Sequence, residues 1–220
     1  MLQWQEIDTV FLDMDGTLLD LHFDAHFWLE FLPVRYSEIH NISLEEAQTH
    51  VHGSIMKEVG TLKWYCFDHW SDYFKLPITE LKHEVADRIG YRHSVKPFLA
   101  WLKSSDRKVL IVTNSHRDGV DLKLSRTELE NEVDGIVSSH DFGYPKESQS
   151  FWQCLMEAHP FDPQRTLMVD DSLPVLRSAR DFGIAHLLTI DQPDMTLPAR
   201  DMSGCDFMSI NDFQEVMVNE

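Results

Sequence analysis

The feature that most constrains the fold is a short apolar run that ends in two closely spaced carboxylates. Residues 10–12 are all apolar, which predicts a strand buried on both faces. Asp13 follows the run directly and Asp15 lies two positions later, before Gly16. Ligands of open α/β sheets bind at the carboxyl ends of strands, and residues i and i+2 of an extended segment point to one side. Both carboxylates are therefore expected to face one ligand, and a cation would keep both ionised.

Four further apolar runs alternate with helical patterns in the second part of the chain. The runs cover residues 109–112, 135–137, 166–169 and 186–190, and the helical patterns cover residues 118–126, 147–158, 173–182 and 211–218. Gly183 follows the third helical pattern and is a typical C-terminal stop. Strands that alternate with helices indicate a parallel sheet with helices on both faces. The sequence therefore predicts a Rossmann-like α/β fold.

The segment from 21 to 95 does not follow this alternation and predicts an inserted helical module. Its expected helices cover residues 23–31, a long stretch after Ser43, and residues 64–74 and 79–89. Ser43 and Glu46 fit a capping box, and Gly60 and Gly90 occupy positions typical of helix C-caps. We therefore expect an α/β core formed by residues 1–20 and 96–220, with an all-helical cap at residues 21–95.

The acidic composition of the 220-residue chain limits its partners. A net charge of −18 argues against nucleic acid and anionic membranes. The three cysteines are far apart and form no CxxC pair, so neither a disulfide framework nor a thiolate zinc site is indicated. No window approaches membrane-spanning length, and the first residues lack the pattern of a signal peptide. We expect a cytoplasmic protein, while the sequence predicts no particular oligomeric state.

Polar residues that carry chemistry occur at four strand ends. They are Asp13 and Asp15 after the first strand, Thr113 and Asn114 at the end of the second, Lys146 in the loop after the third, and Asp170 and Asp171 after the fourth. Each position alone has an ordinary explanation, such as a helix cap or a solvated surface charge. Because the carboxyl ends of parallel strands meet at one edge of a sheet, the four positions together favour a shared site.

The acidic residues of this set fit a phosphoryl-transfer site with a metal ion. Carboxylates select hard cations such as Mg²⁺, and the expected ligands are Asp13, Asp170 and Asp171, together with the neighbouring Asp15. An Asp carboxylate can form a covalent aspartyl-phosphate, so Asp13 is a candidate nucleophile. Asp15 is placed to protonate the leaving oxygen and later to activate water.

The other polar residues of the set are expected to bind the phosphate of the substrate. Phosphoryl transfer depends on positioning and on neutralising the charge of the phosphate oxygens. The groups that supply such contacts are the Lys146 ammonium, the Thr113 hydroxyl, the neighbouring Asn114, and the backbone N–H groups of the Gly16 turn.

The four motifs, in this order, resemble the haloacid-dehalogenase-like hydrolase superfamily. Its signature is DxDGT, then a Thr or Ser, a Lys, and an acidic pair, and the resemblance covers about residues 7–191. The roles that it implies are a nucleophile at Asp13, a general acid and base at Asp15, phosphate binding at Thr113 and Lys146, and metal binding at Asp171 with help from Asp170. The inserted helices are similar to the cap of this superfamily, which closes over the site and selects substrate.

Local stretches narrow the resemblance further. Residues 18–28, 64–71 and 142–146 are similar to the bacterial GMP/IMP nucleotidase group. This resemblance implies a Mg²⁺-dependent purine 5′-nucleotidase with a purine nucleoside monophosphate as substrate. A sugar-phosphate phosphatase or phosphomutase of the same superfamily is the alternative enzyme. A non-catalytic phosphoacceptor module, which also combines acids, a Thr and a Lys on a parallel sheet, is the alternative from another class.

The helical segment contains aromatic residues, histidines and lysines, each with two interpretations. The aromatic residues either stack on a purine base or form a helix–helix core; they are Trp28, Trp64, Tyr65 and Trp70. The histidines either bind a metal or pack on the surface; they are His22, His26, His50, His52, His69 and His83. Lys57 and Lys63 either reach the active site or are solvated.

Overall fold

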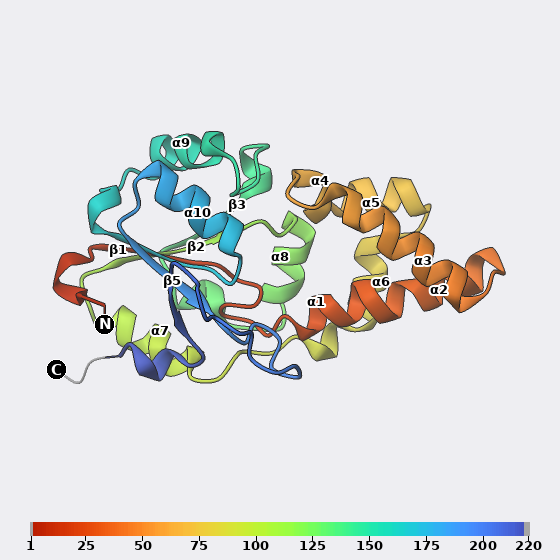
Figure 1. The fold of residues 1–220 in the computed structure, drawn as a ribbon, viewed down its shortest axis with the longest axis horizontal. Helices are drawn as coiled ribbons and strands as arrows, with labels where there is room; N and C mark the ends of the chain where they lie inside the picture. The colour runs from red at the N-terminus through yellow and green to blue at the C-terminus, as the bar shows by residue number, and fades with distance from the viewer. Residues whose placement is uncertain (1, 218–220) are drawn as a thin grey trace.

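A six-stranded sheet forms the centre of the larger part of the molecule in the computed structural model, which describes residues 2–217. The strands are β1 (Thr9–Leu12), β2 (Lys108–Thr113), β3 (Gly135–Ser138), β4 (Thr166–Val169), β5 (His186–Ile190) and β6 (Met208–Ile210). All pairs are parallel, in the order β3-β2-β1-β4-β5-β6 (Figure 1). This confirms the predicted Rossmann-like fold, with β1 at its centre.

Helices cover both faces of this sheet, because the central strands are apolar at successive positions and so present apolar side chains to both faces. These helices are α7 (Val95–Lys103), α8 (Arg117–Leu124), α9 (Gln149–Ala158) and α10 (Leu173–Phe182). Val10 and Leu12 of β1 pack in one cluster with side chains of α7 and α8, whereas Phe11 packs with α9 and α10 on the opposite face. Figure 1 shows α9 and α10 on one side of the sheet and α7 on the other.

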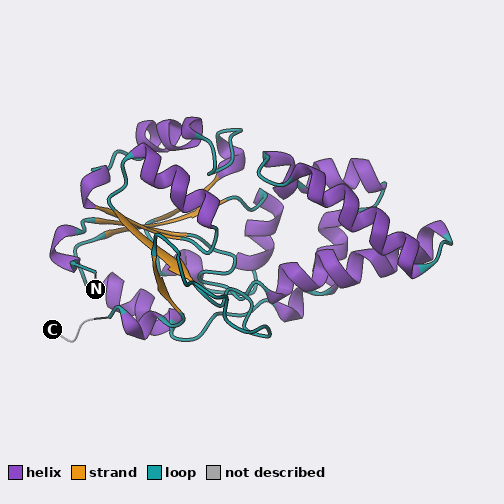
Figure 2. Cartoon of the chain, in the orientation of Figure 1, coloured by secondary structure: helices purple, strands orange, loops and turns teal. Residues whose placement is uncertain are grey.

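The inserted segment contains helices and loops without strands (Figure 2). Its helices are α1 (His22–His26), α2 (Leu32–His40), α3 (Leu44–Ile55), α4 (Leu62–Tyr65), α5 (Phe67–Phe74) and α6 (Ile78–Glu84). Their buried apolar residues form a separate core, to which α8 contributes Leu122. The all-helical insertion is therefore confirmed, while the exact division into residues 1–20, 21–95 and 96–220 stays a prediction.

Several helix ends differ from those predicted within this segment. The expected helix 64–74 is interrupted at Cys66, whose backbone is extended and separates α4 from α5. The first helix does not end at residue 31 but continues through a π-helical stretch, Phe27–Phe31, into α2. Gly60 has a left-handed φ of 81°, whereas Gly90 is not among the residues with positive φ. Gly90 is therefore no left-handed helix cap.

The predicted terminal helix at residues 211–218 is wrong within the described part of the chain. Asp212 caps a single 3₁₀ turn, Phe213–Glu215, whose Phe213 ring stacks on Phe98 of α7 at 4.2 Å. Residue 218 lies outside the described residues. The strand β6 before this turn was missed because three residues are too few to show a period. Among residues 2–217, no helix is both long and apolar enough to span a membrane.

The predicted capping box at the start of α3 is confirmed and gives a test of local stability. Ser43 Oγ accepts a hydrogen bond from Glu46 N at 3.2 Å, and Glu46 Oε2 accepts one from Ser43 N at 3.0 Å. Ser43→Ala should lower the free energy of unfolding by about 1 kcal/mol, because α3 loses its N-terminal partner. Urea denaturation measures this change, and an unaltered free energy would contradict the assigned cap.

Candidate active site

The predicted site residues meet at the carboxyl edge of three adjacent strands. Asp13 follows β1, Thr113 ends β2, and Asp170 with Asp171 follows β4. The strands β2 and β4 are the two neighbours of β1 in the sheet. Lys146 reaches this edge from the loop before α9 and is almost fully buried. The structure therefore brings together residues from four separate parts of the chain.

Lys146 binds two of the carboxylates directly. Its Nζ lies 2.5 Å from Asp13 Oδ1 and 2.6 Å from Asp170 Oδ2, and it donates a further hydrogen bond to the Val112 carbonyl at 3.0 Å. Burial by itself would lower the pKa of Lys146, but the two carboxylates outweigh this effect and raise the pKa above its usual value. The ammonium thus stays charged and holds both acids in place.

Asp13, Asp170 and Asp171 form a group that can hold a metal ion, with ligand oxygens within 4.8 Å of one another. Burial raises the pKa of Asp13 to about 8, of Asp170 to about 6 and of Asp171 to about 7. When ionised, the three carboxylates face one ammonium, and a divalent cation would balance the excess negative charge. An all-oxygen donor set of this kind fits Mg²⁺.

Asp15 lies outside this group, although the sequence placed it among the metal ligands. Its carboxylate turns away from the strand edge, and its Oδ2 lies 2.7 Å from Nζ of Lys123 in α8. Burial raises the pKa of Asp15 while the Lys123 ammonium opposes this shift. The structure therefore separates the two aspartates: Asp13 faces the other acids, and Asp15 faces the helical segment.

Gly16 provides space and a turn rather than a phosphate contact. Its φ is 81°, and a Cβ at this position would lie 2.8 Å from Cγ of Asp171. Its backbone N–H already donates to the Leu19 carbonyl at 2.8 Å, so the phosphate contact expected for this N–H is not available. The backbone N–H groups of Met14 and Asp15 have no hydrogen-bond partner within residues 2–217. Together with the N–H of Thr17, which likewise has no partner among these residues, they are the unpaired donors of this turn.

Thr113 and Asn114 hold the loops around Lys146. Thr113 Oγ1 accepts a hydrogen bond from Ser115 N at 3.0 Å, which leaves its own hydroxyl proton to donate. The Asn114 side chain accepts from Lys146 N at 2.9 Å and donates to Glu147 at 3.0 Å. Both Asn114 groups are thus engaged by protein. Sequence reasoning missed Glu147, which also accepts from the Tyr65 hydroxyl of the helical segment at 3.0 Å.

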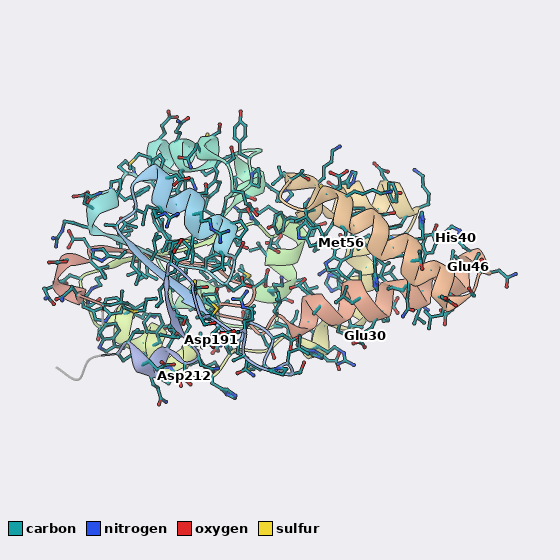
Figure 3. All side chains as sticks on the ribbon, viewed as in Figure 1. Glu30, His40, Glu46, Met56, Asp191 and Asp212 are labelled. Carbon is teal, nitrogen blue, oxygen red and sulfur yellow. The ribbon has the colours of Figure 1, made fainter. Side chains whose placement is uncertain are left out.

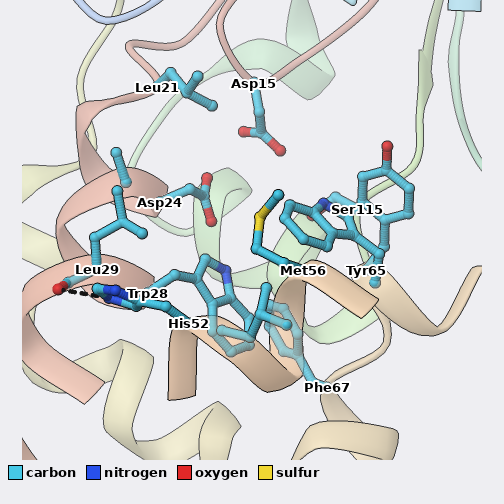
Figure 4. Close-up of a pocket in the computed structure, with 13 residues that line it drawn as sticks. Asp15, Leu21, Asp24, Trp28, Leu29, His52, Met56, Tyr65, Phe67 and Ser115 are labelled. Atoms are coloured by element: carbon cyan, nitrogen blue, oxygen red, sulfur yellow. Dashed lines mark hydrogen bonds between the residues drawn. The ribbon is translucent and has the colours of Figure 1, made fainter. Parts of the chain in front are cut away.

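A pocket of about 340 Å³ lies between the helical segment and the sheet. Its lining residues are Asp15, Leu21, Asp24, Ala25, Trp28, Leu29, His52, Ile55, Met56, Trp64, Tyr65, Phe67 and Ser115. Figure 4 shows Asp15 and Asp24 at one end and the rings of Trp28 and Phe67 at the other. Met56 marks the end of the helical segment near the sheet, far from His40 and Glu46 (Figure 3). The pocket has the size typical of small-molecule sites.

The four aromatic residues considered from the sequence fall into two groups, one that lines the pocket and one in the helical core. Trp28, Trp64 and Tyr65 line the pocket, whereas Trp70 is buried in the helical core. Lys57 and Lys63 are exposed, as expected for solvated charges. Besides Lys146, two further lysines are buried, Lys82 and Lys123, and no sequence pattern singled them out.

The histidines that lie near a possible metal ligand are not among the six considered from the sequence. His50 stacks on Tyr36 with their ring centroids 5.2 Å apart, as expected of a packing residue. Cys66, His116 and His140 lie with their ligand atoms within 4.8 Å. However, His116 Nδ1 accepts a hydrogen bond from Asp118 N at 3.3 Å as the cap of α8. Because a neutral imidazole has one acceptor nitrogen, this capping contact competes with metal binding.

The sequence of the chain matches known proteins over nearly its whole length. A family model described as haloacid dehalogenase-like hydrolase matches residues 7–183. The chain belongs to this hydrolase family. It is 36% identical over 216 residues to the GMP/IMP nucleotidases YrfG of Escherichia coli and of Shigella flexneri, covering 98% of this chain and 96% of each relative.

Solved structures of the family share the fold. A HAD phosphatase from Thermococcus onnurineus has a TM-score of 0.78 at 22% identity, and the match covers 96% of both chains. The HAD-hydrolase YfnB from Bacillus subtilis, bound to magnesium, has a TM-score of 0.65 at 20% identity, again over 96% of both chains. At these identities the comparison shows the fold of the hydrolase family alone.

The raised pKa values predict how pH acts on the metal-free protein. Protonated carboxyls stabilise the fold at low pH, and this stability is lost as pH rises through the folded pKa values of about 6 for Asp170 and about 7 for Asp171. Mg²⁺ should therefore raise the melting temperature more at about pH 8 than at about pH 5.5, because at the lower pH it competes with protons. Thermal unfolding with EDTA and with Mg²⁺ measures this difference, and equal stabilisation at both pH values would contradict it.

Proposed function

We propose that the protein is a Mg²⁺-dependent phosphomonoesterase that hydrolyses purine nucleoside 5′-monophosphates such as GMP and IMP. The observation that carries this substrate class is the pocket, which begins at Asp15 and ends at aromatic rings. Aromatic side chains can stack on the face of a base. The near-full-length similarity to two GMP/IMP nucleotidases supports the same substrate. A cytoplasmic location stays a prediction.

Asp13 is the proposed nucleophile. One of its carboxylate oxygens attacks phosphorus, a new oxygen–phosphorus bond forms, and the bond to the leaving oxygen of the nucleoside breaks. Asp15 donates its proton to that leaving oxygen. Lys146, the Thr113 hydroxyl and the free N–H groups of the turn after β1 neutralise the phosphate oxygens.

The second half of the reaction regenerates the enzyme. Asp15, now a carboxylate, takes a proton from water, and the resulting hydroxide oxygen attacks phosphorus. The bond between phosphorus and Asp13 breaks, and inorganic phosphate leaves. Asp13, Asp170 and Asp171 would hold Mg²⁺, which when bound supplies positive charge to the phosphate oxygens.

Phosphate release from a panel of substrates tests this proposal. With Mg²⁺, GMP and IMP should be hydrolysed faster than pyrimidine nucleotides and hexose phosphates. Asp13→Asn should abolish turnover with every substrate, because an amide is no nucleophile, while its circular dichroism spectrum should match the wild type. Faster hydrolysis or isomerisation of hexose phosphates would favour a sugar-phosphate phosphatase or phosphomutase instead. A single stable phosphorylation without turnover would favour a phosphoacceptor module.

The aromatic wall of the pocket gives a separate test of base recognition. Trp64→Ala should raise KM for GMP by about tenfold, since base–aromatic stacking contributes about 1–3 kcal/mol. KM for ribose 5-phosphate, which has no base, should change little. Steady-state kinetics on both substrates provides the comparison within one variant. Equal changes for the two substrates would show that the Trp64 ring does not contact the base.

A further inference from the structure

Four charged side chains form a buried row between the sheet and the helical segment. In order they are Lys82, Asp24, Lys123 and Asp15, so the charges alternate in sign. Lys123 Nζ lies 2.7 Å from Asp15 Oδ2 and 2.9 Å from Asp24 Oδ2. Asp24 Oδ1 in turn contacts Nζ of Lys82. Relative exposure is 0% for Lys82 and 2% for Lys123, so water contributes little to either charge.

The row joins two parts of the molecule that are otherwise distinct. Asp24 lies in α1 and Lys82 in α6, both in the helical segment, whereas Lys123 lies in α8 beside the sheet and Asp15 follows β1. The ammonium of Lys82 is also surrounded by aromatic rings at 4.7–5.3 Å, which belong to Phe23, Phe27, Trp28 and Phe67. These cation–π contacts fix Lys82, and through it Asp24.

Stability alone is a weak explanation for such a row. Burying a pair of charges costs about as much as their attraction returns, and apolar side chains of similar volume often stabilise a protein equally well. Of the four residues, Asp15 and Asp24 line the pocket, and Asp15 belongs to the proposed chemistry. Because Lys123 contacts Oδ2 of Asp15, it fixes the rotation of the carboxyl group and so the direction of Oδ1.

We propose that Lys123 is a positioning residue for proton transfer by Asp15, and that Asp24 and Lys82 hold Lys123 in place from the helical segment. The inference rests on the proposed phosphomonoesterase function and extends it. In this arrangement the proton of Asp15 is aimed at the leaving oxygen only while the helical segment is docked on the sheet. Lys123 itself neither contacts the phosphate group nor carries the transferred proton.

The leaving group distinguishes this role from a purely structural one. An alkyl leaving oxygen, as in a nucleotide, needs the proton from Asp15 as its bond to phosphorus breaks. The p-nitrophenyl leaving group is a stable anion and needs almost none. Loss of positioning should therefore slow release of the alkyl leaving group selectively, whereas loss of folded protein slows both substrates by the same factor.

Lys123→Met tests the proposal through kcat/KM for a nucleoside monophosphate and for p-nitrophenyl phosphate, measured on one preparation, because kcat/KM excludes the later hydrolysis of phosphorylated Asp13, in which Asp15 acts as a base for both substrates. The nucleotide rate should fall by about 100-fold, the lower range of general acid catalysis, and the p-nitrophenyl phosphate rate by less than about tenfold. Lys96→Met is the matched control, because Lys96 is exposed on α7 and pairs only loosely with Glu128 at 3.8 Å. Its ratio of the two rates should equal that of the wild type.

Asp24→Asn is the second variant, in case removal of Lys123 prevents folding. The amide keeps the shape of the side chain but removes the charge that holds Lys123, so the ratio should shift in the same direction by a smaller factor. An unchanged ratio in both variants, or in Asp24→Asn alone if Lys123→Met does not fold, would overturn the inference. Wild-type protein without activity on either substrate would instead reject the proposed function.

Discussion

A buried ammonium between two buried carboxylates is the interaction on which the site depends. Parallel strands bring Asp13 and Asp170 to one edge of the sheet, where both are almost fully enclosed. Without Lys146 these acids would face each other in a region of low dielectric, and removing one partner of a buried pair typically costs about 3–5 kcal/mol. The Lys146 contacts therefore explain how adjacent strands can present several acids to one ligand. With Asp13, Asp170 and Asp171 ionised, the single Lys146 ammonium leaves two negative charges uncompensated, which is the physical reason to expect a divalent cation.

A second buried ammonium between two carboxylates lies beside Asp15. Lys123 is buried between Asp15 and Asp24, and its pKa is raised because the two carboxylates outweigh the effect of burial. Two lysines thus divide the acids into two groups with different surroundings. Asp13 belongs to the group at the sheet edge, and Asp15 belongs to the group that faces the helical segment. This division gives two neighbouring aspartates separate roles, one as nucleophile and one as proton carrier.

The sequence predicted the features that depend on local patterns. The strand at 166–169 and the helix at 173–182 have the expected bounds, because buried parallel strands are continuously apolar and Gly183 ends the helix in a left-handed conformation. Asp13 and Asp170 come together because β1 and β4 are neighbours in the sheet, and Lys146 reaches them from the loop beyond β3. The rule that the carboxyl ends of parallel strands meet at one edge was enough to group these residues.

Features that depend on contacts between distant helices were not predictable. Lys82 and Lys123 lie in ordinary helical sequence, and nothing near them shows that their charges are buried. Whether Asp15 turns toward the metal ligands or toward α8 depends on those lysines, so its direction was missed. The use of the Gly16 N–H within its own turn likewise depends on the path of the chain after the strand.

The central claim is that Asp13 accepts the phosphoryl group while Lys146 holds the Asp13 carboxylate in place. A crystal structure of the protein with Mg²⁺ and beryllium fluoride, which mimics a phosphoryl group bound to a carboxylate, tests this claim most directly. The account predicts beryllium bonded to one carboxylate oxygen of Asp13, with the Mg²⁺ ion held by Asp13, Asp170 and Asp171. Beryllium fluoride bonded to Asp15, or bound with no bond to any carboxylate, would contradict the account.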